Sequence, residues 1–194
     1  VFCTDGLIQV DPCPEEGDPT YGQDGNYDGP RPGFETSPEV AVDEVTGLEW
    51  SRIEIDTNRA WEGARQQCEN VHTAGGHDDW RLPTISELRT LVRGCLKTQP
   101  EGTCNLRDEC PEESCWEESE CQHPCEFGEG PTPDSGESAI GWYFIAPIEG
   151  SATIHWSTTG NPGNSNEVWG LAFTTAGISV LDKSGNLMAR CVHD

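Results

Sequence analysis

The strongest local signal in the chain is a helix start at Thr84. Its hydroxyl can accept a hydrogen bond from the backbone of Glu87, whose carboxylate can reach back to the Thr84 backbone, and this reciprocal pair is a capping box. Pro83 keeps the preceding chain extended, since the residue before a proline avoids helical geometry. We predict a helix from Ile85 to about Arg93, ended by Gly94. Its apolar face would consist of Ile85, Leu88, Leu91 and Val92.

A second amphipathic helix is predicted upstream, from about Asn58 to Val71. Its apolar face would consist of Trp61, Ala64, Cys68 and Val71. Between the two helices, Trp80 and Arg81 lie in the extended segment before the capping box, where we expect them to be packed rigidly. Residues 40–50 predict two short strands around a turn at Thr46 and Gly47.

Ten cysteines, an even number, suit a disulfide framework in an exported protein. Cys3 and Cys13 could close a loop in an irregular leader, residues 1–20. An insert at residues 95–137 has few aliphatic residues, so cross-links or ions must order it. Its cysteines are Cys95, Cys104, Cys110, Cys115, Cys121 and Cys125. Their pairing stays open, although the short separation favours Cys95 with Cys104. Cys121, His123 and Cys125 also have zinc-ligand spacing, but disulfides are the favoured interpretation.

The formal net charge of −24 is concentrated in residues 1–49 and 101–137. Such a surface repels phosphates and anionic lipids, so we expect no nucleic-acid partner. No apolar run has the length of a membrane span, so we expect no membrane insertion. We interpret the chain as an exported protein, extracellular or on the cell surface, whose signal peptide has been removed. The acidic residues would serve solubility in a salty exterior or bind divalent cations.

A twelve-residue segment starting at Asp24 fits the calcium-loop pattern in which oxygen ligands alternate before a glycine and a closing glutamate. The predicted ligands are the side chains of Asp24, Asn26, Asp28 and Glu35 and the backbone carbonyl of Pro30. Neighbouring prolines exclude the two helices of an EF-hand, so the loop would act alone. The alternative is a pair of turns that hold no ion.

From Ile140 onward the pattern is typical of strands. Strands are predicted at 141–144, 155–158, 168–174, 178–182 and 187–192, with the last three forming an antiparallel meander. Between Trp156 and Trp169 lies a polar loop, residues 157–167, whose amides and hydroxyls suit saccharide or protein recognition. The candidate ligand-binding residues are Trp156, Thr159, Asn161, Asn164, Asn166 and Trp169. The alternative is an ordinary solvated loop with both tryptophans buried.

Several short motifs follow one another along the chain. They are TGLEW (46–50), Trp61 with Ala64 and Cys68, DWRLPT (79–84), HWSTT (155–159), VWGLAF (168–173) and ARCV (189–192). In that order they resemble the C-terminal domain of Legionella collagen-like adhesins, from about Tyr21 to the C-terminus. The resemblance implies one α+β domain, residues 21–194, with a C-type-lectin-like fold of two short helices packed on small antiparallel sheets. It also implies a disulfide between Cys68 and Cys191. The Glu-Pro-Asn and Trp-Asn-Asp triplets of calcium-dependent sugar binding are absent from the sequence.

No arrangement of residues indicates catalysis, and we expect no enzymatic activity. No two histidines are spaced as a metal-binding pair, and no serine lies in a Gly-x-Ser-x-Gly elbow. We therefore expect a secreted or surface-displayed adhesion or recognition domain that binds a glycan or protein ligand and is stabilised by calcium. The alternative is a structural subunit of an extracellular filament, in which the chain associates with itself.

Overall fold

A computed structural model describes the backbone of residues 3–4, 9–10, 33–52, 55–71, 73–133, 141–144 and 153–194. The chain divides into two compact units, Val1–Gly33 and Phe34–Asp194, and each is described by itself. In the first unit, strand β1 (Cys3–Thr4) pairs antiparallel with strand β2 (Gln9–Val10). The predicted Cys3–Cys13 disulfide and the predicted calcium ligands Asp24, Asn26, Asp28 and Pro30 lie outside the described side chains.

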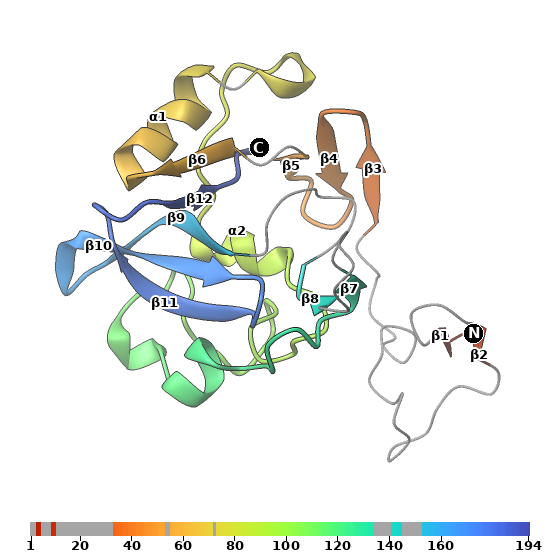
Figure 1. The fold of residues 1–194 in the computed structure, drawn as a ribbon, viewed down its shortest axis with the longest axis vertical. Coiled ribbons are helices and arrows are strands. Elements are labelled where there is room, and N and C mark those ends of the chain that lie inside the picture. The colour runs from red at the N-terminus through yellow and green to blue at the C-terminus, as the bar shows by residue number, and fades with distance from the viewer. Residues whose placement is uncertain are drawn as a thin grey trace. The chain divides into compact units, whose positions relative to one another are not determined.

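The second unit combines many short strands with few helices, which confirms the predicted α+β class (Figure 1). Its helices are α1 (Trp61–Val71) and α2 (Ile85–Thr90), with shorter helical segments η2 (Ala74–Gly76), η3 (Glu113–Cys115) and η4 (Glu118–Gln122). Its strands are β3 (Phe34–Thr36), β4 (Val40–Asp43), β5 (Glu49–Ser51), β6 (Ile55–Arg59), β7 (Thr132–Pro133), β8 (Gly141–Trp142), β9 (Ile154–Asn161), β10 (Asn164–Ala172), β11 (Gly177–Asp182), β12 (Leu187–Ala189) and β13 (Val192–His193).

Two sheets carry most of these strands, with the orders β11-β10-β9-β12-β6 and β13-β5-β4-β3. The predicted strand pair around Thr46 and Gly47 is confirmed as β4 and β5, and Gly47 has the positive φ of 78° that a glycine tolerates there. A short pair, β7 with β8, is separate from both sheets.

The predicted C-terminal meander is wrong in its last strand. The meander consists of β9, β10 and β11, whereas β12 pairs in parallel with β9 and antiparallel with β6. The chain leaves β11 and passes α1, where the Trp61 amide donates to the Lys183 carbonyl at 3.0 Å. The Cys68–Cys191 disulfide holds the end of the chain beside α1. Strand β12 consequently lies toward the edge of the sheet opposite β11, between β9 and β6.

Both predicted helices are shorter than expected. Helix α1 begins at Trp61, because residues 55–59 form β6 and pair with β12. Helix α2 has the predicted Thr84–Glu87 capping box but ends at Thr90, because Val92 leaves the helix to bridge with Phe144. Leu91 and Val92 are still buried, as predicted, although they lie beyond the helix.

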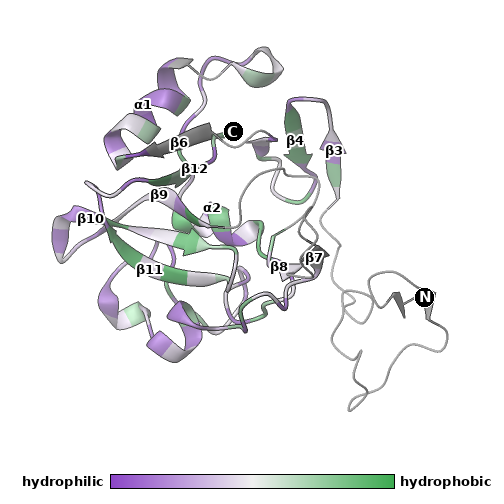
Figure 2. Cartoon of the chain, viewed as in Figure 1, coloured by the Kyte–Doolittle hydropathy of each residue, from purple (hydrophilic) through white to green (hydrophobic). Residues whose placement is uncertain are grey.

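The core has two apolar clusters. One gathers α2, β10, β11 and the insert around Trp50 and Trp169, and the other gathers α1, Trp80 and Trp156. Helix α1 is largely hydrophilic (Figure 2), and its fully buried residues are Ala64 and Cys68. Trp61 is only half-buried, so the prediction that it belongs to the core holds in part.

Disulfides order the insert, as its lack of aliphatic residues requires. The pairs are Cys95–Cys125, Cys104–Cys121 and Cys110–Cys115, and each cysteine whose side chain is described is bonded. The favoured pairing of Cys95 with Cys104 is therefore wrong, and the zinc interpretation of Cys121 and Cys125 gives way to disulfides, as expected.

A buried arginine organises the loop between these cysteines. The guanidinium of Arg89 donates to four carbonyls of the loop that joins Cys95 to Leu106, at distances of 2.7–2.9 Å; they belong to Thr98, Gln99, Cys104 and Leu106. The loop therefore closes around the guanidinium, and its two cysteines bond outside the loop, to Cys125 and Cys121. Burial lowers the pKa of Arg89 to about 10, so the group is still charged at neutral pH.

Candidate functional site

The predicted ligand-binding loop at residues 157–167 is a β-hairpin. Strand β9 continues to Asn161, Pro162 and Gly163 form the turn, and β10 begins at Asn164, which pairs with Asn161. The prediction of a loop was wrong because glycine, proline and asparagine are typical of turns. Here they make a tight turn and an irregular ladder between two long strands.

Two of the six candidate ligand residues, Trp156 and Trp169, are core residues, with 0% and 1% of their surface exposed. The Trp156 indole donates to the Arg59 carbonyl at 3.1 Å, and the Trp169 indole donates to the Pro111 carbonyl at 2.8 Å. Both polar atoms are therefore satisfied inside the protein, which agrees with the alternative interpretation of these residues.

Thr159 and Asn161 hold the hairpin to its surroundings. The Thr159 hydroxyl accepts from the Ile85 amide at 2.8 Å and donates to Asp108 at 2.6 Å. The Asn161 side chain donates to Glu167 at 2.8 Å and accepts from the Gly163 amide at 3.0 Å. These contacts fix the position of the turn relative to helix α2 and the insert.

Asn164 and Asn166, the other two candidates, are exposed near the turn, and Ser165 between them is exposed as well. Asn164 accepts from the Asn166 amide at 3.1 Å, and Lys183 donates to the Ser165 carbonyl at 2.8 Å. The ammonium group of Lys183 also lies 4.7 Å from the centre of the Trp61 ring. The strand segment 164–166, which we call the hairpin tip, thus presents amides and a hydroxyl to solvent from a supported backbone.

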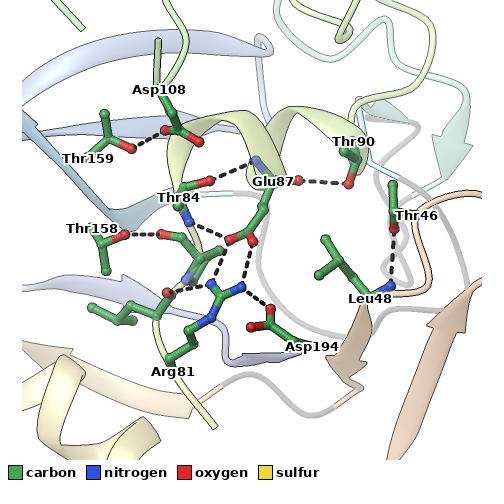
Figure 3. Close-up of polar contacts among 12 residues, drawn as sticks. Thr46, Leu48, Arg81, Thr84, Glu87, Thr90, Asp108, Thr158, Thr159 and Asp194 are labelled. Carbon is green, nitrogen blue, oxygen red and sulfur yellow. Dashed lines mark hydrogen bonds and ion pairs between the residues drawn. The ribbon is translucent and has the colours of Figure 1, made fainter.

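The backbone of the hairpin is supported by the segment around the Thr84–Glu87 capping box. Arg81 donates to both oxygens of Glu87, at 2.8 and 2.6 Å, while Glu87 also accepts from the Thr84 amide (Figure 3). Arg81 pairs as well with Asp194. The hydrogen bonds that Arg81 donates to Glu87 raise the pKa of Arg81 above its ordinary value. One arginine therefore joins the start of α2 to the end of the described chain.

The same segment contacts strand β9 directly. The Thr158 amide donates to the Pro83 carbonyl at 2.8 Å, and the Thr158 hydroxyl donates to the same oxygen at 3.3 Å. Figure 3 shows this hydroxyl contact and the neighbouring one between Thr159 and Asp108. The capping segment and the hairpin consequently form one rigid structure. Asp108 adds a carboxylate of the insert beside Thr159, whereas Lys183 contacts the tip itself, so the charged groups around the hairpin have both signs.

Metal-ligand residues occur at three described places. Glu35, the last residue of the predicted calcium loop, is exposed on β3, while its predicted co-ligands lie outside the described residues. A second group, Glu49, His77 and His193, comes together from distant parts of the chain. Sequence analysis missed this group, since it considered only the spacing of histidines along the chain. A third group, Cys110, Glu112 and Cys115, has both thiols in one disulfide.

Fold and site together define a disulfide-linked α+β domain that presents a rigid polar hairpin. The chain belongs to the Lcl C-terminal domain family, whose model matches residues 39–193. It is therefore an adhesin-related surface domain. Neither curated proteins nor solved structures gave a match. None of the helices in the described part of the chain is both long and apolar enough to span a membrane.

Proposed function

We propose that this domain acts outside the cell as an adhesion or recognition module that binds a glycan or protein ligand through the hairpin tip. The observation that carries the proposal is the exposed run Asn164–Asn166 on a turn fixed to helix α2 and to the insert. Amides and hydroxyls held in place can make directional hydrogen bonds at a small cost in conformational entropy.

Charge restricts the ligand class. The chain carries a net charge of −24, which outweighs the single ammonium group of Lys183 at the hairpin tip. Polyanions such as sulfated glycans would be repelled, whereas neutral glycans and basic protein surfaces would not. A neutral glycan or a basic protein segment is therefore the proposed ligand.

We also propose that the fold is C-type-lectin-like. Two observations support this: the long-range disulfide between Cys68 and Cys191, and the pairing of the last strand, β13, with β5 near the start of the matched region. The triplets that carry calcium-dependent sugar binding in such lectins are absent from the sequence. Ligand binding by the hairpin tip would therefore be independent of calcium, and calcium at Asp24–Glu35 would serve stability.

The test is binding of the purified chain to a glycan array and to immobilised basic proteins. The Asn164→Ala/Asn166→Ala variant should lose at least about tenfold in affinity. An Asn70→Ala variant, which changes an exposed asparagine on helix α1, should bind like the unaltered chain. Equal binding by all three proteins would remove the hairpin tip from the proposal. Filaments in negative-stain images, with no ligand retained, would favour the structural-subunit function instead.

A further inference from the structure

We propose that Glu49, His77 and His193 bind a divalent transition-metal ion, with Zn²⁺ as the best-fitting ion. The three residues come from β5, from the segment after η2, and from β13. Their ligand atoms all lie within 4.8 Å of one another. This site is independent of the hairpin tip and of the predicted calcium loop.

The distances suit coordination of one ion. His77 Nε2 lies 3.1 Å from Glu49 Oε2, and His193 Nδ1 lies 3.9 Å from the same oxygen. Zinc binds imidazole nitrogen and carboxylate oxygen at about 2.0–2.2 Å, so tetrahedral ligands are about 3.3 Å apart. Glu49 and His193 are also direct partners in the β5–β13 ladder, so the backbone fixes their proximity. Small side-chain shifts would complete the site.

The hydrogen bonding of His193 also supports a metal site. Its Nε2 lies 2.8 Å from Asp79 Oδ1, where Nε2–H donates to the carboxylate. A neutral ring with that proton presents the lone pair of Nδ1 toward Glu49. This Nδ1 atom is buried and makes no hydrogen bond to any residue of the described chain. A lone pair facing a carboxylate repels it, whereas a cation between the two would bind both.

Asp79 has the role that carboxylates commonly play behind a metal-binding histidine. Such a carboxylate accepts the proton of the second ring nitrogen, fixes the tautomer and makes the ligating nitrogen more basic. Asp79 itself is exposed, and its contact with His193 depends on the same extended segment that leads to Trp80. Asp79 is thus a positioning residue in this proposal.

Aromatic packing holds both histidine rings in place. Their centroids are 4.2 Å apart, and the Trp80 ring lies 6.3 Å from His77 and 5.8 Å from His193. The buried Trp80 indole donates to the Ala74 carbonyl at 3.1 Å. Gly75 has a φ of +64°, which a glycine adopts without strain, so the chain can turn here. It also packs against Val40, whose side chain a Cβ at this position would meet at 2.8 Å. The ligands therefore belong to a rigid part of the molecule.

Donor chemistry selects the ion. Two imidazole nitrogens and one carboxylate oxygen suit Zn²⁺, whereas Ca²⁺ and Mg²⁺ prefer oxygen ligands alone. Glu49 and His77 are partly exposed, so an ion can enter from solvent and keep a water as its fourth ligand. The strongly negative chain also raises the local concentration of cations.

The experiment is calorimetric titration of the chelator-treated full chain with Zn²⁺ in excess Ca²⁺. We expect one strong site, while His77→Ala and His193→Ala should each weaken binding by at least about tenfold and Asp79→Asn by about tenfold. His123→Ala, which removes an exposed histidine of the insert, is the matched control and should bind like the unaltered chain. The excess Ca²⁺ occupies sites made of carboxylates alone.

A second measurement does not depend on the folding of any variant. NMR spectra of the histidine rings in the unaltered chain should show Zn²⁺ shifting the signals of His77 and His193 but not that of His123. Co²⁺ should give the visible absorption of a four-coordinate site that Zn²⁺ removes. Zinc binding that is absent, or that shifts all histidines alike, would overturn the proposal. So would equal affinity of the chain and its folded His77→Ala variant.

Discussion

Cys68 in helix α1 and Cys191 between strands β12 and β13 form a disulfide across a sequence separation of 123 residues. Their Cα atoms are 5.5 Å apart, and both side chains are fully buried in the cluster that contains Trp80 and Trp156. The bond therefore joins the first helix to the end of the sheet.

Removing this disulfide should cost more stability than removing a short one. In the chain-entropy model, a loop of this length contributes about 5 kcal/mol, whereas the Cys110–Cys115 loop, with a separation of 5 residues, contributes about 2 kcal/mol. Chemical unfolding of the Cys68→Ser/Cys191→Ser and Cys110→Ser/Cys115→Ser variants measures both losses. Equal losses would show that the long loop is already restricted in the unfolded chain.

Replacing Arg89 should unfold the insert selectively. An Arg89→Met variant keeps most of the volume but leaves four carbonyl oxygens without the guanidinium, and one such buried acceptor costs about 1–3 kcal/mol. We expect a loss of at least about 3 kcal/mol and faster hydrogen exchange between residues 98 and 106. Arg107→Met is the control, because Arg107 is partly exposed and its guanidinium makes only a long contact of 3.4 Å, to the Asn105 carbonyl, within the described residues. Similar losses in both variants would contradict this role of Arg89.

Local chemistry made the capping segment predictable. The Thr84–Glu87 capping box, the strand pair around Gly47 and the core residues of α2 depend on interactions between near neighbours, which sequence patterns contain. The pairing of Cys68 with Cys191 was different, since it came from the family resemblance. The end of α2 was mispredicted because its cause, the bridge from Val92 to Phe144, joins segments far apart in sequence.

In the candidate sites, too, features that depend on near neighbours were predictable and features that depend on distant segments were not. Turn-forming residues between Trp156 and Trp169 indicated an exposed polar segment correctly, but the number of residues in the turn depends on strand pairing that sequence does not contain. The insert pairing joins cysteines 30 and 17 residues apart, and the loop between them is held by Arg89, a side chain that precedes the insert. The Glu49–His77–His193 group requires the β5–β13 pairing, so no spacing rule could find it.

Calcium should stabilise the chain through the loop from Asp24 to Glu35, whose sequence supplies alternating oxygen ligands. At roughly 100 times the dissociation constant, an ion that binds only the folded state adds about 2.7 kcal/mol of stability. We therefore expect the Tm to rise with added Ca²⁺, and Asp24→Ala/Glu35→Ala to abolish this rise. Glu44→Ala, which removes one exposed carboxylate from the β4–β5 turn, is the control and should keep it. A Ca²⁺ response that survives in the double variant would assign the stabilisation to another group of carboxylates, because that variant lacks both the first and the last ligand of the loop.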